Sequence, residues 1–215
     1  MMKIALFDID NTIISTDSFV DFVKYMIKQD KSNRKKLPIF LIYSVSYMLK
    51  IIKAKQFKTK ILNLFFAQHH NIEATSKQFV LEKVIPNIKD GFTNTLKELR
   101  KDGFTIVFAT ASFEFYLKHL ADFLRADIFV GTRAVLNKDK ACYEYIGENC
   151  KGDEKINRLL NLFDEKDIDK ANSVSYSDSL TDLPFLKLTD KFYLVDRIEW
   201  KILKVISKEN TGSKT

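Results

Sequence analysis

Two aspartates separated by a single residue form the most chemically distinctive feature of the sequence. Asp8 and Asp10 lie in the segment 7–12, which follows the short apolar run 3–6, and the hydroxyl of Thr12 comes two positions after Asp10. Such a run is typical of a buried strand, in which aspartate is uncommon and a carboxylate is costly unless it is paired or bound to metal. Because ligand sites of α/β proteins lie at the carboxyl ends of strands, the pair predicts a ligand site.

Three further polar clusters follow apolar runs or begin predicted helices. They contain, in chain order, Thr110 and Ser112, Lys151 and Lys155, and Asp178 and Asp182. If these strand ends converge, they form an oxygen-lined pocket of the kind that Mg²⁺ prefers. The hydroxyls and an ammonium group would suit the remaining oxygens of a bound phosphate.

The elements that must hold these clusters alternate between strand and helix. Strands are predicted over 3–8, 104–109, 127–130, 173–176 and 192–195, with a hairpin over 133–145 that turns at 137–139. Helices are predicted over 92–100, 113–124, 151–163, 183–188 and 200–206. This alternation predicts an α/β fold with a Rossmann-like parallel sheet covered by helices on both faces.

An all-helical block interrupts this alternation after the first strand. Helical spacing of apolar residues begins near Ser18, and further helices are predicted over 37–52, 55–67 and 72–84. We therefore predict a helical cap domain over 17–86, inserted into a core domain made of 1–16 and 87–207. A flexible tail is predicted over 208–215.

The positive charge is concentrated in this block. Residues 31–60 contain nine lysines and arginines and no acidic residue, whereas the whole chain has a net charge of +7, so the remainder is net negative. A local basic segment indicates an anionic substrate or partner and argues against general nucleic-acid binding. The 2 cysteines lack metal-ligand spacing and no secretory signal is visible, which favours a reducing, cytoplasmic location.

Four motifs in this order resemble the haloacid dehalogenase superfamily, within it the phosphoserine-phosphatase-like hydrolases of subclass IB, which carry an early helical (C1) cap. Residues 7–12 resemble the DxDxT motif, and 108–112 resemble the second motif, which ends in a hydroxyl. Gly152 and Lys155 resemble the lysine motif, and 176–186 resemble the acidic motif. The resemblance covers the chain from Lys3 to about Trp200 and implies a Mg²⁺-dependent phosphatase that acts on a small phosphorylated metabolite.

The resemblance also implies a role for each motif residue. Asp8 would be the nucleophile that forms an aspartyl-phosphate, and Asp10 would be the general acid and base. Thr12 would help to fix Asp10. Thr110, with Ser112 as an alternative, and Lys155 would bind the phosphoryl group. The metal would be held by Asp8, by the backbone carbonyl of Asp10, by Asp178, and by Asp182 either directly or through the lysine.

Some assignments stay open at this point. Lys151 is a rival to Lys155 for the motif lysine. Asp17 is equally compatible with a substrate-facing residue and with a helix N-cap. The alternatives to a hydrolase are a phosphotransferase, which would use the same residues, and a non-catalytic module that binds a phosphorylated ligand, which would not need Asp10. The oligomeric state is not predicted.

The apolar run 37–52 allows two interpretations. With 16 residues it is shorter than the roughly 20 that span a bilayer, and a buried helix of the cap is the favoured interpretation. The alternative is an interfacial helix on an anionic membrane, because basic residues flank the run on both sides. That alternative would make the protein membrane-peripheral and would favour a lipid phosphate, as in phosphatidylglycerophosphate phosphatases, as substrate.

Overall fold

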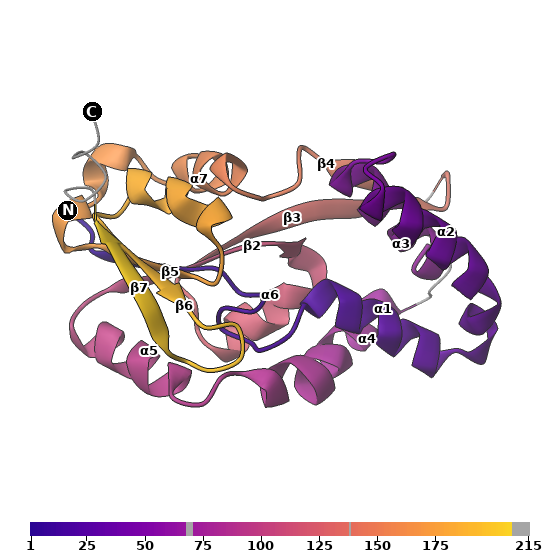
Figure 1. Cartoon of the computed structure of the whole chain (residues 1–215), viewed down its shortest axis with the longest axis horizontal. Helices are drawn as coiled ribbons and strands as arrows, with labels where there is room; N and C mark the ends of the chain where they lie inside the picture. Colours follow the sequence, from indigo (N-terminus) through magenta and orange to yellow (C-terminus); the bar gives the residue numbers. More distant parts are fainter. Residues whose placement is uncertain (68–70, 138, 208–215) are drawn as a thin grey trace.

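A seven-stranded sheet forms the centre of the computed structural model, which describes residues 1–67, 71–137 and 139–207 (Figure 1). Its strand order is β4-β3-β2-β1-β5-β6-β7. The five inner strands are parallel, and β4 and β7 are antiparallel edges. The strands are β1 (Ile4–Phe7), β2 (Thr105–Phe113), β3 (Ile128–Asn137), β4 (Cys142–Ile146), β5 (Val174–Ser177), β6 (Lys191–Val195) and β7 (Ile202–Ser207). The predicted α/β fold is confirmed.

The central strand β1 divides the apolar core into two layers. Successive side chains of a strand point to opposite faces of the sheet. Ala5 and Phe7 accordingly belong to one buried cluster, and Ile4 and Leu6 belong to the other. This explains why β1 reads as a continuous apolar run, since both of its faces are covered.

Helices cover the two faces of the sheet. The cluster around Phe7 contains residues of α5 (Phe92–Lys101) and α6 (Glu114–Phe123). The cluster around Leu6 contains residues of α7 (Asp153–Leu160) and of the 3₁₀ helix η6 (Leu180–Lys187). Two further 3₁₀ turns, η4 (Glu165–Asp167) and η5 (Lys170–Asn172), lead from α7 into β5.

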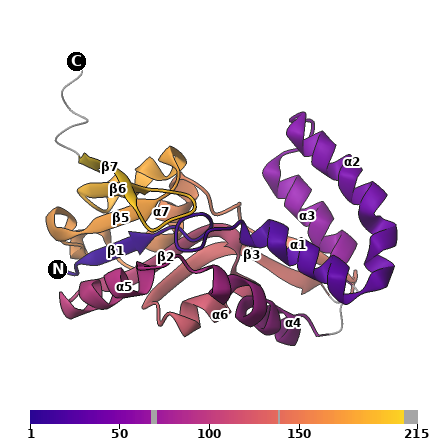
Figure 2. The same ribbon diagram turned by 60° about the horizontal axis from the view of Figure 1, so that its bottom comes forward.

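The helical block between β1 and β2 begins with three helices that lie beyond one end of the sheet (Figures 1 and 2). They are α1 (Ser18–Gln29), α2 (Leu37–Met48) and α3 (Ala54–Phe65), and the 3₁₀ helix η1 (Lys31–Lys36) joins the first two. The chain then returns beneath the sheet through α4 (Ile72–Phe79), a π-helical turn η2 (Val80–Val84) and η3 (Ile85–Asn87). The exact division into cap and core stays a prediction.

The prediction that residues 37–52 form a buried helix is wrong. The helix exists as α2, but none of its residues is buried. Its aromatic side chains Phe40 and Tyr47 contact Phe65 and Phe57 of α3, and the opposite face carries exposed aliphatic residues. No helix within the described ranges is both long and apolar enough to cross a membrane.

The last predicted helix is also wrong. Residues 202–207 form β7, which pairs antiparallel with β6. β-Branched residues such as Ile202, Val205 and Ile206 pack well on a pleated surface, and pairing with β6 satisfies their backbone groups. The predicted turn at 137–139 includes residue 138, and the predicted tail 208–215 follows Ser207, so both lie wholly or partly outside the described residues.

The strand β2 is longer than predicted and irregular. We expected it to end at Ala109, but it continues to Phe113. Ala109 lies opposite Val130 of β3 whereas Phe113 lies opposite Thr132, so the register shifts between these pairs. Such bulges redirect side chains and are common beside functional sites. Here the bulge contains the polar pair Thr110 and Ser112.

Candidate active site

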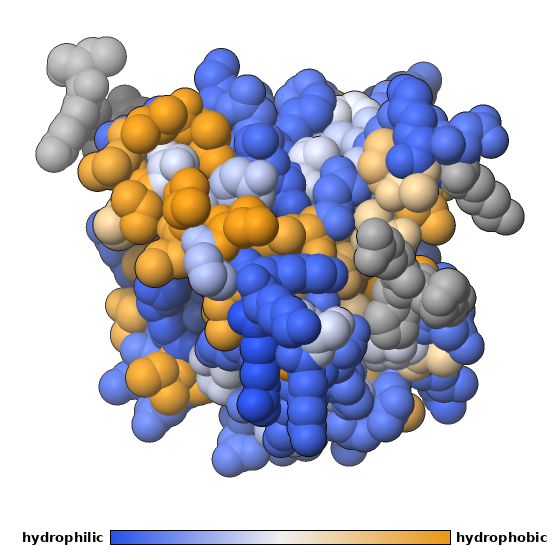
Figure 3. Space-filling model, turned by 90° about the vertical axis from the view of Figure 1, so that its right-hand side faces the viewer, coloured by the Kyte–Doolittle hydropathy of each residue, from blue (hydrophilic) through white to orange (hydrophobic). Residues whose placement is uncertain are grey.

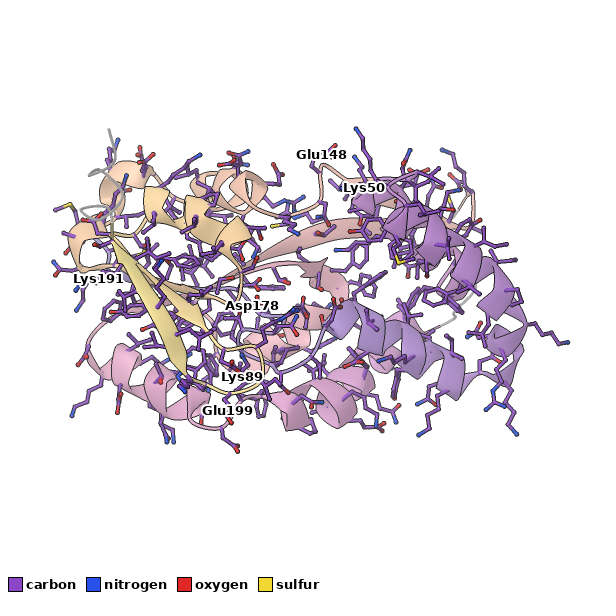
Figure 4. All side chains as sticks on the ribbon, viewed as in Figure 1. Lys50, Lys89, Glu148, Asp178, Lys191 and Glu199 are labelled. Carbon is purple, nitrogen blue, oxygen red and sulfur yellow. The ribbon has the colours of Figure 1, made fainter. Side chains whose placement is uncertain are left out.

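The polar clusters converge on one cavity at the carboxyl edge of the sheet. Its volume is about 320 Å³. In Figure 4 the labelled Asp178 lies on the side of the sheet that faces α1. The sequence-predicted residues in the cavity wall are Asp8, Asp10, Asp17, Ser112, Lys151, Lys155, Asp178 and Asp182. The strand ends therefore bring together residues as far apart in the chain as Asp8 and Asp182.

Lys155 joins two of the predicted carboxylates. Its Nζ donates to Asp8 Oδ1 at 2.6 Å and to Asp182 Oδ2 at 2.9 Å. Gly152, which has a positive φ of 57°, precedes α7, and Lys155 lies in the first turn of this helix with 2% exposure. Lys151 lines the cavity but is exposed. Of the two lysines, Lys155 is therefore the one that contacts Asp8 directly.

Thr12 connects Asp8 to Asp178. Its Oγ1 lies 3.2 Å from Asp8 Oδ2 and 3.3 Å from Asp178 Oδ1, and it accepts the amide of Asp178 at 2.9 Å. We expected Thr12 beside Asp10, whereas the structure places it between these two other aspartates. The two carboxylates of Asp8 and Asp178 thus converge on one hydroxyl.

Asp10 turns in another direction. Asn11 has a positive φ of 57°, which asparagine tolerates, and the chain turns there. Asp10 Oδ1 accepts the amide of Ser18 at 2.7 Å, and Oδ2 accepts the hydroxyl of Ser112 at 2.6 Å. Thr110 Oγ1 lies 3.3 Å from the same Oδ2. The two aspartates of the first motif therefore have separate partners.

The two hydroxyls of the second motif differ in access. Ser112 lines the cavity, but Thr110 is completely buried and its hydroxyl accepts the amide of Ser112 at 3.0 Å.

Asp17 is both a helix N-cap and a residue of the cavity wall, the two positions that the sequence left open. Its Oδ1 caps α1 by accepting the amide of Val20 at 3.0 Å, and the residue also lines the cavity.

Burial controls the charges of the aspartates. Burial raises the pKa of Asp8 to about 7, and the positive charge of Lys155 opposes this rise. Burial and then the charge of Asp17 raise the pKa of Asp10. Burial alone would lower the pKa of Lys155, but Asp8 and Asp182 hold it above the ordinary value. A carboxyl group whose pKa is raised toward neutral pH can both give up and take up a proton near that pH, as proton transfer requires.

Three polar residues of the cavity wall lie outside the four predicted motifs, namely Lys58, Asn149 and Arg197. Lys58 belongs to α3 and donates to Ala111 O at 2.7 Å and to Asn149 Oδ1 at 3.1 Å. Arg197 Nε lies 3.2 Å from Asp178 Oδ2. The strand-end rule could have identified Arg197, which follows β6 by two residues, but nothing in the basic segment distinguishes Lys58 from its neighbours.

The donor set is compatible with a magnesium ion of few protein ligands. Within residues 1–67, 71–137 and 139–207, no three His, Cys, Asp or Glu residues are grouped closely enough to hold a metal by themselves. The neighbouring carboxylates of Asp8 and Asp178 match in kind the one or two carboxylates by which Mg²⁺ is usually held, together with waters and substrate phosphate. Asp182 Oδ1 is buried without a hydrogen-bond partner among the described residues, whereas its Oδ2 accepts from Lys155.

Comparisons with known proteins agree with this arrangement. The haloacid dehalogenase-like hydrolase family matches residues 5–187. The chain is 24% identical over 204 residues to a histidinol-phosphatase from Neisseria meningitidis serogroup C (strain 8013), with 89% of each chain covered.

Solved structures share the fold. A protein of unknown function from Bordetella pertussis Tohama I has a TM-score of 0.74 at 17% identity, with 89% of each chain covered. A phospho-aspartyl intermediate analogue of phosphoserine phosphatase has a TM-score of 0.58 at 18% identity, covering 89% of this chain and 85% of the other. The chain belongs to the haloacid dehalogenase-like hydrolase family, which confirms the family, the fold and the prediction of a hydrolase.

Proposed function

We propose that the protein is a Mg²⁺-dependent phosphomonoester hydrolase that works through an aspartyl-phosphate on Asp8. The observation that carries the proposal is the contact of 2.6 Å between Asp8 and the ammonium group of Lys155 in a cavity at the strand ends. A carboxylate that attacks a phosphate meets like charge, and a buried cation beside it offsets that repulsion. The relatives named as phosphatases support the same class of reaction.

In the first step, an oxygen of Asp8 attacks phosphorus and the bond from phosphorus to the leaving alkoxide breaks. Asp10 donates its proton to that alkoxide, for which its raised pKa is suited. In the second step, Asp10 takes a proton from water, and the resulting hydroxide attacks phosphorus and releases phosphate from Asp8. Ser112 and the amide of Ser18 hold Asp10 in place for both transfers.

Asp8 and Asp178 are the carboxylates that would hold Mg²⁺, together with the backbone carbonyl of Asp10. When bound, Mg²⁺ supplies positive charge that stabilises the transferring phosphoryl group. Asp182 supports the site through Lys155, because its Oδ2 accepts from Lys155 Nζ and from Ser177 Oγ.

The proposed substrate is a small phosphorylated metabolite. A cavity of about 320 Å³ is near the lower limit of small-molecule sites. Its wall contains the acidic residue Asp17 and the basic residues Lys58, Lys151 and Arg197, so both signs of charge are available to groups of the substrate other than the phosphate. The names of the histidinol-phosphatase and phosphoserine phosphatase relatives are compatible with such a substrate.

The test is the variant Asp8→Asn, assayed with p-nitrophenyl phosphate and Mg²⁺. We expect turnover to fall by at least about 10³-fold while the circular dichroism spectrum is unchanged, because an amide is not a nucleophile here. The matched control is Asp167→Asn, an exposed position outside the cavity, which should keep wild-type activity. Full activity of Asp8→Asn would refute the mechanism, and transfer to an added alcohol in place of phosphate release would identify a phosphotransferase.

A further inference from the structure

The outer face of α2 is an unusual surface for a globular protein. Exposed aliphatic side chains on this face include Leu41, Ile42, Val45 and Met48 of the helix and Leu49, which follows it, with exposed fractions from 39% for Val45 to 72% for Met48. Their spacing of three and four residues places them on one side of the helix. We call these five residues the α2 apolar face. Contiguous exposed apolar surface of this kind marks an interaction site.

The polar atoms of α2 do not interrupt this face. Leu37 to Leu49 contains no charged residue. The hydroxyls of Ser44 and Ser46 each donate to the carbonyl four residues earlier, those of Phe40 and Ile42, both at 2.8 Å. Their donors are therefore satisfied within the helix, as an apolar environment requires.

Basic side chains border the α2 apolar face at both ends of the helix. The exposed ones are Lys31, Arg34, Lys35, Lys50 and Lys53. Lys55 pairs with Glu148 at 2.7 Å, but none of the five exposed residues forms an ion pair with any other residue that the structure describes. Figure 3 shows hydrophobic side chains directly beside a block of hydrophilic ones on this end of the molecule. The border therefore presents uncompensated positive charge.

We propose that the α2 apolar face and its basic border dock onto the surface of an anionic lipid bilayer. A helix of 12 residues is about 18 Å long, which is too short to cross the hydrocarbon core but suits a position parallel to the surface. Apolar side chains enter the acyl boundary, and lysines at the edges contact anionic headgroups. A partner of this kind therefore accounts for both the apolar side chains and the basic side chains of this surface.

A second copy of the chain is a poorer match for the same surface. An isologous contact places each patch against its own copy, which would bring the basic borders together and cost binding energy. A bilayer with anionic headgroups supplies the opposite charge around the helix and an apolar layer beneath it. Tyr47, on the opposite side of α2, lines the cavity, so docking places α2 between the cavity and the lipid surface.

The experiment is flotation of the full chain with phosphatidylcholine vesicles, with and without phosphatidylglycerol. We expect binding only to the anionic vesicles at low salt, and its loss at high salt. Leu41→Glu combined with Met48→Glu should weaken binding at least about tenfold, since it places charges in the apolar layer. Lys31→Glu, Arg34→Glu and Lys35→Glu together should weaken it at least about a hundredfold, at about fivefold per basic residue.

Matched controls are Leu162→Glu for the apolar changes, and Lys97→Glu with Lys101→Glu and Lys191→Glu for the charge changes. These residues are exposed and lie outside α2 and its border. The controls should bind as the wild type does, and every variant should keep its activity toward p-nitrophenyl phosphate. Absence of binding to anionic vesicles, or binding that the α2 changes leave intact, would overturn the proposal. A dimer in solution that Leu41→Glu dissociates would assign the face to a second copy instead.

Discussion

Lys155 Nζ lies between two buried carboxylates, 2.6 Å from Asp8 and 2.9 Å from Asp182. Asp8 directly follows β1, Asp182 lies in the first turn of η6, and Lys155 lies in the first turn of α7. Asp8 and Asp182 together outweigh the cost of burying the ammonium group, because the pKa of Lys155 stands above its ordinary value. This arrangement keeps a cation beside the proposed nucleophile throughout the reaction.

The variant Lys155→Met should lose both stability and activity. Removing one partner of a buried ion pair leaves uncompensated charge, which costs about 3–5 kcal/mol of the free energy of unfolding. Burial already raises the pKa of Asp8 to about 7, and losing Lys155 raises it further, so the folded state takes up protons more readily than the unfolded state. The loss of stability should therefore be smaller at pH 5 than at pH 8, which urea denaturation at the two pH values measures.

Lys151→Met is the matched control, and it decides between the two lysines of the third motif. Lys151 is exposed, so its loss should leave the denaturation midpoint unchanged at both pH values. We expect turnover at saturating substrate to survive this change and to fall by orders of magnitude in Lys155→Met. The reverse result would assign the motif lysine to Lys151.

Asp10→Asn should separate the two chemical steps. p-Nitrophenolate is a good leaving group that needs little protonation, so Asp8 can still be phosphorylated, whereas the attack of water loses its general base. That loss is worth about 10²–10⁴-fold. Stopped-flow assays should show a burst of about one equivalent of p-nitrophenol, followed by slow turnover. Wild-type turnover without a burst would remove Asp10 from the acid–base role.

Removal of metal should abolish activity. Restoring activity should then require more Mg²⁺ when Asp178 is changed. Asp8 and Asp178 converge on Thr12, so Asp178→Asn leaves one carboxylate of the pair. We expect this variant to need at least about tenfold more Mg²⁺ for half-maximal activity after treatment with EDTA. Calorimetric titration of Mg²⁺ without substrate measures the same change independently. Asp167→Asn should match the wild type, and an unchanged Mg²⁺ requirement in Asp178→Asn would exclude it as a ligand.

The sequence predicted the sheet and the cavity well because their signals are local. Strand ends such as Asp8 and Asp178 are marked by a carboxylate that directly follows an apolar run. Parallel pairing then brings these ends to one edge without further information. The same rule applied after β6 would have included Arg197.

The failures have a different physical origin. The composition of residues 202–207 is compatible with a strand or with a short amphipathic helix. They form a strand because the edge of β6 offers backbone groups for pairing. The apolar run of α2 indicated burial, but among the residues that the structure describes its aromatic side packs against α3 while its aliphatic side stays exposed. Which side of such a helix is covered depends on tertiary packing, which periodicity alone does not specify.

Lys58 should contribute charge to substrate binding from α3. Its ammonium group contacts two neutral acceptors, Ala111 O and Asn149 Oδ1, and burial lowers its pKa to about 8, although the charges of Asp10 and Asp17 act in the opposite direction. Because the amine is charged below this pKa and neutral above it, attraction to a phosphate weakens as pH rises through about 8. We expect KM for p-nitrophenyl phosphate to increase over that range, with a smaller change in kcat.

Lys58→Met should raise KM about tenfold at pH 7, because one charge-assisted hydrogen bond is lost. The KM of this variant should also no longer depend on pH near 8, because the titrating amine is absent. Lys58→Arg stays charged throughout, so its KM should also be independent of pH in this range, but without the increase if the cavity accepts the guanidinium group. The matched control is Lys60→Met, on the same helix but exposed and placed over the ring of Tyr43. A pH-dependent KM that persists in Lys58→Met would assign the titration to another group and leave Lys58 only its structural contacts with Ala111 and Asn149.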